Sequence, residues 1–205
     1  MRPTVCLVAP TLRPAWTCPP SVVMAGAYES ELQTALGLVQ RASLAASALQ
    51  GGIARSNKAT SKEDRTGTGF GVSPVTVADF TVQVLLLGAL AKAFPGDRFI
   101  AEETAEQLLG ADAPTREAVV AAASRYGGVL TEAEACDALD LGLTGTADGW
   151  SGSGRTWVLD PIDGTKGFLR GDNYAIALSL LEGGRPVLGL LGCPNLTRVS
   201  NTAAT

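Results

Sequence analysis

The chain contains no histidine among its 205 residues, and this absence argues against several kinds of active site at once. Zinc sites with imidazole ligands, Ser-His-Asp triads and Cys-His pairs all need a histidine. The four cysteines are scattered, form no Cys-x-x-Cys pair and favour reduced thiols in an intracellular protein. Any chemistry must therefore rest on other side chains.

Long apolar runs and an excess of basic residues are also missing. The longest apolar runs, such as Val82–Leu87, fall far short of the roughly 20 residues that a membrane-spanning helix needs. The formal net charge of −4 gives no general affinity for nucleic acid. We therefore expect a soluble globular protein with neither a membrane nor a nucleic-acid partner.

The first 28 residues contain no acidic residue but two arginines and five prolines. An acid-poor, arginine-containing start is typical of organelle transit peptides, although five prolines would spoil the amphipathic helix of a mitochondrial one. A chloroplast-type transit peptide, an extension upstream of a start at Met24 and a disordered tail all stay open. We expect residues 1–27 to lie outside the fold. The expected location is cytoplasmic, or chloroplast or mitochondrion if this segment is a transit peptide.

Hydrophobic periodicity predicts long helices in the first part of the chain. Apolar residues at helical spacing predict one helix over 29–53, which Gly51 and Gly52 should end or fray. The polar, glycine-rich stretch 54–73 is typical of a loop. After it, an apolar stretch ending near Phe94 predicts a buried helix.

Strands are expected mainly in the second half. A short strand is predicted over 98–101, and helical patterns follow over 103–142 with breaks at Pro114 and at Gly127-Gly128. After an exposed connector over 145–154, the segment RTWVLDP is typical of a strand, and YAIALSLLEGGRPVLGLLGCP of a β-hairpin. Helices first and paired strands later favour an α+β layered fold.

Carboxylates stand at the edges of predicted elements in three places. These are Asp79, the pair Glu102-Glu103 and the pair formed by Asp160 and Asp163. Carboxylates that converge without histidine or cysteine select hard cations that prefer oxygen ligands, so Mg²⁺ is expected. Taken singly, each carboxylate also has a simpler interpretation, as a helix cap, an exposed helix start or a solvated position.

The segment WVLDPIDGTKGFLRG (157–171) gives the closest spacing of acidic groups. Pro161 should fix a turn, so that the Asp160 and Asp163 carboxylates and the Ile162 carbonyl can face one point. The Gly-Thr that follows allows close backbone approach and can begin a helix whose N–H groups cradle a phosphate. A metal ion is therefore the predicted source of the missing positive charge.

The same segment resembles the core motif of the lithium-sensitive, Mg²⁺-dependent phosphatases that include inositol monophosphatase. TKGFLRGDNYAIALSLLEGG and LGCPNL look like the 3'(2'),5'-bisphosphate nucleotidases in particular. SPVTVADF is similar to the family's segment with the catalytic aspartate, and FIAEET to its segment with the first metal-binding glutamate. MAGAYESELQTALGLVQRAS resembles the usual N-terminus of the family, so the resemblance covers about residues 24–197.

The resemblance implies an activity and a set of site residues. The activity is Mg²⁺-dependent hydrolysis of the 3'-phosphate of 3'-phosphoadenosine 5'-phosphate, a small-molecule substrate, to AMP and phosphate by a metal-activated water. The implied metal ligands are Glu102, Asp160, Asp163 and the Ile162 carbonyl; Asp79 and Thr165 orient and deprotonate the water, and Gly164 and Thr165 contact the phosphate.

The resemblance also implies the domain organisation. We expect a layered α/β sandwich of the inositol monophosphatase/fructose-1,6-bisphosphatase type, with an N-terminal phosphatase domain over 28–197 and a tail over 198–205. The family's second domain carries a Trp-Asp-x-Ala type motif, which this sequence lacks, so we expect that domain to be largely missing. Two alternatives stay open, an inositol phosphate phosphatase and a catalytically silent fragment, as does the oligomeric state.

Overall fold

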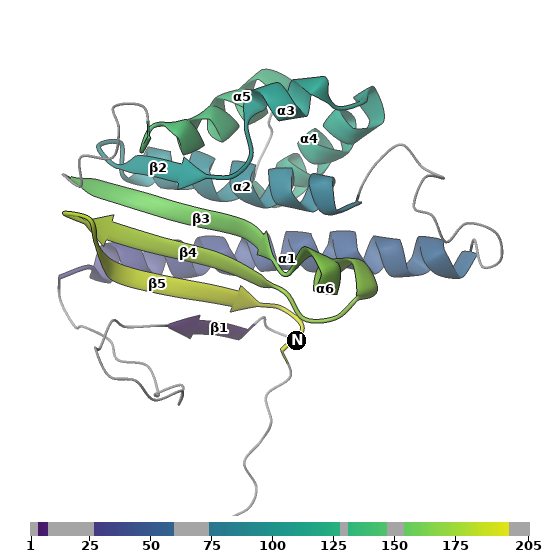
Figure 1. Ribbon diagram of the computed structural model, residues 1–205, viewed down its shortest axis with the longest axis horizontal. Helices are drawn as coiled ribbons and strands as arrows, with labels where there is room; N and C mark the ends of the chain where they lie inside the picture. The colour runs from purple at the N-terminus through teal and green to yellow at the C-terminus, as the bar shows by residue number, and fades with distance from the viewer. Residues whose placement is uncertain (1–3, 8–26, 60–73, 128–130, 147–153, 197–205) are drawn as a thin grey trace, which may run out of the picture.

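A computed structural model describes residues 4–7, 27–59, 74–127, 131–146 and 154–196 of the chain. Two long helices lie along one face of a mixed β-sheet, and a group of shorter helices packs beside them (Figure 1). The predicted α+β layered fold is confirmed. Among the described helices, none is both long and apolar enough to cross a membrane.

The two long helices are α1 (Glu29–Ala59) and α2 (Pro74–Ala93). Both were predicted, but α1 does not end at Gly51-Gly52. Each glycine costs only about 1 kcal/mol relative to alanine inside a helix, and extending an existing helix is much easier than nucleating one. The helix therefore continues through the glycine pair to Ala59.

Within the described residues the sheet has five strands, in the order β1-β5-β4-β3-β2. The strands are β1 (Thr4–Leu7), β2 (Arg98–Ala101), β3 (Arg155–Asp163), β4 (Ala175–Glu182) and β5 (Arg185–Cys193). Only β2 and β3 are parallel, and the other neighbours are antiparallel. The predicted hairpin is confirmed: β4 and β5 are joined by Gly183 and Gly184, whose φ angles of 56° and 76° suit a tight two-residue turn.

The edge strand β1 was not expected. Residues 1–27 were predicted to lie outside the fold, yet Thr4–Leu7 pairs antiparallel with β5, Thr4 opposite Cys193 and Leu7 opposite Leu190. Threonine and valine suit an extended backbone, and the free edge of β5 offers the pairing groups. Residues 1–3 and 8–26 lie outside the described residues, so the transit peptide stays a prediction.

The helical stretch after β2 consists of three α-helices and one short 3₁₀ turn. They are α3 (Ala105–Gly110), α4 (Ala113–Gly127), α5 (Glu132–Asp140) and η1 (Leu141–Leu143). The break at Gly127 is confirmed, and so is the one near Pro114, because α3 ends at Gly110 and α4 begins at Ala113. Pro114 lies in the first turn of α4, where its missing N–H has no partner to lose, and Asp112 caps the helix by accepting a hydrogen bond from Thr115 N (2.8 Å).

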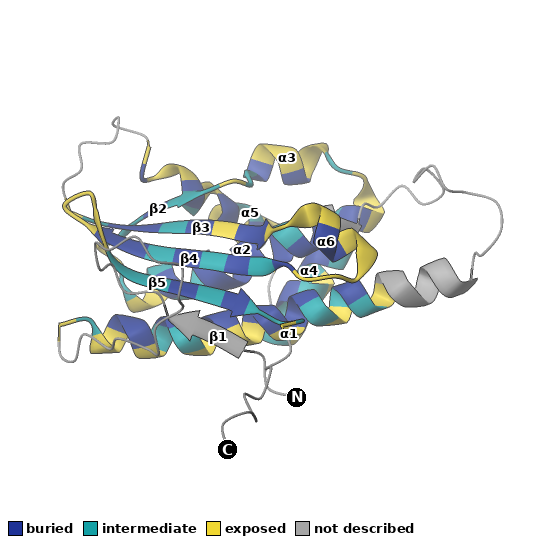
Figure 2. Cartoon of the chain, turned by 60° about the horizontal axis from the view of Figure 1, so that its bottom comes forward, coloured by how far each residue is buried: buried dark blue, intermediate teal, exposed yellow. Residues whose placement is uncertain are grey.

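Helix α2 is buried from two sides, which explains why its sequence is apolar almost all round. On one side a large core joins α1, α2 and the sheet, with Trp157 and Phe99 fully buried in it. On the other side Phe80 and Val84 of α2 meet α3, α4 and α5. The sheet face away from α1 and α2 is less well covered, as the half-buried residues on its strands show (Figure 2).

Candidate metal centre

The parallel register of β2 and β3 brings the first two acidic positions together. Ala101, the last residue of β2, pairs with Leu159 of β3, so that Glu102 and Asp160 follow at the same level on neighbouring strands. Neighbouring strands lie about 4.8 Å apart. Two carboxylates far apart in the sequence therefore meet at one edge of the sheet, as predicted.

A β-bulge brings the third acidic position to the same place. Asp160 pairs with Ala177 of β4 and Asp163 pairs with Ala175, so two residues of β3 lie opposite one of β4. In a regular strand, residues three apart point to opposite faces; the extra residue cancels this alternation. The predicted turn at Pro161 is thus a bulge inside a strand that continues to Asp163, and proline suits it because it has no N–H for the ladder.

Helix α6 (Thr165–Arg170) begins directly after the bulge, as predicted. Gly164 has a φ of 93°, a left-handed conformation that favours glycine, and the chain can therefore turn at once into the helix. The Thr165 hydroxyl donates a long hydrogen bond of 3.5 Å to the Ile162 carbonyl. Five of the predicted site residues thus lie within one bulge and the turn that follows it: Asp160, Ile162, Asp163, Gly164 and Thr165.

Asp79 approaches these carboxylates from α2. Burial, then Glu103, Glu102 and Asp160, in that order of effect, raise the pKa of Asp79 from its ordinary 3.8 to about 8. The structure therefore brings the N-terminal half of α2 to the carboxyl ends of β2 and β3. It also gives Glu103 the largest electrostatic effect on Asp79, a role that the sequence analysis did not assign to it.

The pKa values of two other carboxyl groups at this edge, Asp160 and Glu103, are also raised. Burial and Asp163, then Glu102, raise the pKa of Asp160, and burial and Glu102 raise that of Glu103. Arg155 forms ion pairs with Glu31 and Asp97 at the start of β3, at the opposite end of the strand from Asp160. The acidic edge thus holds a surplus of negative charge that a cation would relieve.

Two of the predicted arrangements are not formed. Within the described residues, no three acidic, cysteine or histidine side chains are gathered closely enough to hold a metal ion. Among the hydrogen bonds of the same residues none joins Asp79 to Thr165, whose hydroxyl faces Ile162 instead. The carboxylates share an edge of the sheet without enclosing a coordination shell.

The donor chemistry of this edge nevertheless fits Mg²⁺. Carboxylates and a backbone carbonyl are hard oxygen donors, and Mg²⁺ usually keeps several waters and takes only a few protein ligands. Asp160 also lines a hollow of about 270 Å³ on the open sheet face, together with Val158, Ala177 and Leu191. Of the predicted ligands Asp160 alone lines this hollow, and most of its other lining residues are apolar, so the fit to Mg²⁺ rests on the donor chemistry and not on the hollow.

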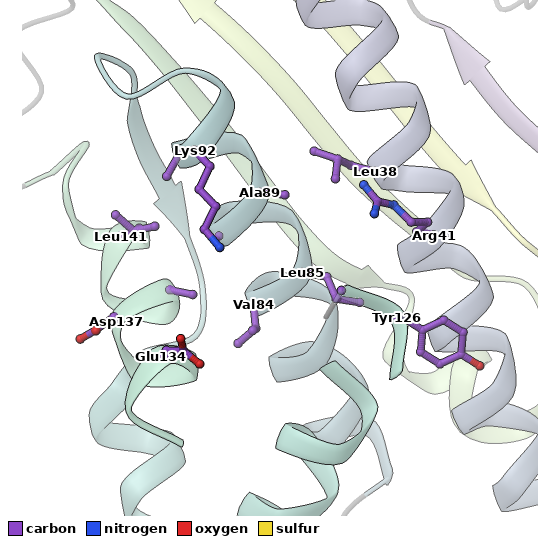
Figure 3. Close-up of a pocket in the computed structure, with 14 residues that line it drawn as sticks. Leu38, Arg41, Val84, Leu85, Ala89, Lys92, Tyr126, Glu134, Asp137 and Leu141 are labelled. Carbon is purple, nitrogen blue, oxygen red and sulfur yellow. The ribbon is translucent and has the colours of Figure 1, made fainter. Parts of the chain in front are cut away.

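A second cavity, larger than this hollow, lies elsewhere among the described residues. It measures about 470 Å³ and is bounded by α1, α2, α4, α5 and η1. Figure 3 shows Arg41 on α1, Lys92 on α2, and Glu134 and Asp137 on α5 around it. None of the predicted site residues lines it, so the chemistry predicted from the sequence does not belong to this cavity.

The comparison with family models agrees with the acidic edge. The model of the inositol monophosphatase family matches residues 29–205, which include all the acidic positions described above. The chain belongs to the inositol monophosphatase family. The resemblance seen in the sequence is therefore confirmed.

Curated relatives that the chain resembles include 3'(2'),5'-bisphosphate nucleotidases of fungi and plants. 3'(2'),5'-bisphosphate nucleotidase 2 of Candida albicans is 37% identical over 188 residues, covering 85% of this chain and 49% of that protein. 3'(2'),5'-bisphosphate nucleotidase 1 of Arabidopsis thaliana is 39% identical over 185 residues, covering 85% and 49%. The chain spans about half the length of the curated relatives it matches.

Solved structures give a weaker likeness. The inositol monophosphatase II of Staphylococcus aureus is 18% identical, with a TM-score of 0.44 over 79% of this chain and 41% of that one.

Proposed function

We propose that this chain carries the metal- and phosphate-binding part of a Mg²⁺-dependent 3'(2'),5'-bisphosphate nucleotidase. The substrate would be 3'-phosphoadenosine 5'-phosphate, hydrolysed at its 3'-phosphate to AMP and phosphate. The observation that carries the proposal is the meeting of Glu102, Asp160 and Asp163 at one sheet edge, in a chain whose curated relatives bear this enzyme name.

The carboxylates at the edge would hold the ion. Glu102, Asp160, Asp163 and the Ile162 carbonyl supply hard oxygen donors, and the mutual repulsion that raises the pKa of Asp160 supports a cation between them. Bound Mg²⁺ would polarise the phosphoryl oxygens and the attacking water. Without histidine in the chain, this assistance suits the donor set at hand.

The other site residues would act on the water and the phosphate. Asp79 and Thr165 would orient the water for in-line attack, and Asp79 would accept its proton. As the bond from the water oxygen to phosphorus formed, the bond from phosphorus to the 3'-oxygen would break, and the leaving 3'-oxygen would take up a proton from solvent. The phosphate would be held by the backbone at Gly164 and Thr165, where α6 begins. The left-handed Gly164 leaves no side chain in the way of that approach.

The test is phosphate release by the purified chain from 3'-phosphoadenosine 5'-phosphate, with Mg²⁺ and with EDTA. Inositol 1-phosphate runs alongside as the competing substrate, and Asp163→Asn serves as the control that lacks one ligand charge. Mg²⁺-dependent release from the nucleotide by wild type, and its loss in the variant, are the expected results. Phosphate release from inositol 1-phosphate alone would mean that the substrate is an inositol phosphate and not the nucleotide. No release from either compound would contradict the proposal for this chain.

A further inference from the structure

Gln83 of α2 makes an unusual pair of hydrogen bonds to the turn that carries Glu102. Its side chain is fully buried. Its Nε2 donates to the Glu103 carbonyl (2.6 Å), and its Oε1 accepts from the Glu103 N–H (2.9 Å). The same Nε2 also lies 3.4 Å from the Leu139 carbonyl at the end of α5. One amide therefore satisfies both backbone groups of Glu103.

A buried amide in an otherwise apolar helix is costly unless its polar atoms are paired. The Gln83 amide is hydrogen-bonded to the turn after β2 and to α5. It therefore fixes α2, this turn and α5 relative to one another. Asp79 lies four residues earlier, one helical turn away on the same face of α2. These hydrogen bonds of Gln83 to Glu103 and Leu139 are called the clamp below. The clamp sets the distance from Asp79 to Glu102 and Glu103, the two charged residues that raise the pKa of Asp79 most.

The rest of the turn is held in the same manner. The Thr104 N–H donates to Gln107 Oε1 (2.7 Å), and the Ala105 N–H donates to Asp140 Oδ1 (3.0 Å). Together with the Glu103 N–H, three consecutive amides are bound by side-chain oxygens from α2, α3 and α5. Of the three, Gln83 alone also binds a carbonyl of the turn, so it sets the orientation of the backbone next to Glu102.

We propose that Gln83 is a positioning residue for the metal centre, one that aims the Glu102 carboxylate through the backbone of Glu103. The inference rests on the metal-dependent function proposed above. Partners that orient a metal ligand from outside the coordination shell usually change metal affinity by about 10- to 100-fold when removed. A residue that only stabilised the fold would lower the melting temperature without this effect.

The test is Mn²⁺ binding to the chain, followed by the electron paramagnetic resonance signal of the free ion, with Mn²⁺ as the probe for Mg²⁺. Gln83→Met keeps the length and volume of the side chain but removes its hydrogen bonds. Val119→Ala is the control, because Val119 is fully buried in the small core that Phe80 and Val84 of α2 also join, and it takes no part in the hydrogen bonds of the turn given above. We expect Gln83→Met to bind Mn²⁺ at least about tenfold more weakly, and Val119→Ala to bind it within twofold of wild type.

Amide hydrogen exchange of the metal-free chain tests the hydrogen bonds between Gln83 and Glu103 independently of metal binding. We expect the Glu103 amide to exchange at least about tenfold faster in Gln83→Met and at the wild-type rate in Val119→Ala. An unchanged Glu103 amide would overturn the clamp, and a faster amide with unchanged Mn²⁺ affinity would overturn the positioning role. If wild type bound no Mn²⁺, the proposed metal centre would fail, and with it the role of Gln83. Equal weakening in both variants would reduce Gln83 to a structural residue.

Discussion

The acidic turn after β2 is held by side chains from other elements. The bulge at the end of β3 and the Gly164 that follows it, together called here the turn after β3, are held by their own backbone. In the first, Gln83, Gln107 and Asp140 bind three consecutive N–H groups. In the second, the bulge and the left-handed Gly164 give the chain its course within a few residues. The same kind of site is thus built by tertiary contacts on one strand and by local geometry on the next.

Because of this difference, the geometry of the two turns should be sensitive to different substitutions. The turn after β2 depends on α2, α3 and α5 being in place, so it can lose its geometry through a distant change. The turn after β3 keeps its geometry as long as the bulge and Gly164 are intact. Substitutions should therefore act at a distance on Glu102 and only locally on Asp160 and Asp163.

The largest expected effect is that of Asp163→Asn, which removes one charge from the bulge and leaves the backbone as it is. Because the amide is a weaker ligand for a hard cation, we expect Mn²⁺ affinity and Mg²⁺-dependent phosphate release to fall together, by about 100-fold. Electron paramagnetic resonance and a phosphate assay measure the two quantities. Wild-type activity at low Mg²⁺ in this variant would remove Asp163 from the ligand set.

Gly167→Ala tests how tightly the backbone after the bulge is packed. A Cβ at this position would lie 2.1 Å from the Asn173 carbonyl oxygen, so either α6 or the chain at Asn173 must move. We expect a loss of about 1–3 kcal/mol in the free energy of unfolding, measured with urea. Gly171→Ala is the partner variant, because a Cβ there meets no atom within 4 Å and only its φ of 77° opposes the change. A tolerated Gly167→Ala would show that this region is looser than its backbone implies.

The stability of the metal-free chain should fall as the pH rises from about 5 to 8. Asp79 has a pKa of about 8 in the folded chain against an ordinary 3.8. Between these values the folded state binds the extra proton, and its stabilising effect is lost as the pH approaches the folded pKa. Since Asp79 is only half-buried, we expect a loss on the order of 1–2 kcal/mol across this range.

Urea unfolding in EDTA at several pH values measures this slope, and Asp79→Asn should flatten it. Glu103→Gln should flatten it more than Asp160→Asn, because Glu103 raises the pKa of Asp79 more than Asp160 does. The reverse order would mean that the turn after β3, and not the one after β2, dominates the field at Asp79. A slope that Asp79→Asn left unchanged would contradict the raised pKa itself.

Local signals predicted much of the fold and one half of the site. The glycine pair of the β4–β5 hairpin and the Asp-Pro-x-Asp-Gly-Thr run specify their geometry within a few residues, and both were predicted. The errors arose where a local signal was outweighed. The Gly51-Gly52 pair did not stop a helix that was already formed, and Thr4–Leu7 paired with β5 although residues 1–27 were expected to lie outside the fold.

The acidic residues of the other half were also predicted, but the side chain that holds their turn in place could not be predicted in the same way. A single glutamine in an apolar helical pattern shows nothing of its partner, and the contact from Gln83 to Glu103 exists only once α2 has packed beside the end of β2. The one usable signal was its position, one turn after Asp79 in a helix with few polar residues. Gln50 is a second case of the same kind. Its Nε2 donates to the Phe168 carbonyl at 2.9 Å, and the two residues lie 118 positions apart in the sequence.

Gln50→Met gives the smallest expected effect and the sharpest contrast with Gln83→Met. The buried Gln50 amide donates to the Phe168 carbonyl and, at 3.3 Å, to the Asp172 carbonyl, and it accepts from Asn195 Nδ2 at 2.8 Å. Losing these bonds should cost about 1 kcal/mol in the free energy of unfolding. Mn²⁺ affinity should stay within about threefold of wild type, since the bulge and Gly164 hold Asp160 and Asp163 without Gln50. If Gln50→Met weakened Mn²⁺ binding as much as Gln83→Met, the turn after β3 would depend on distant side chains too, and the contrast between the two turns would be lost.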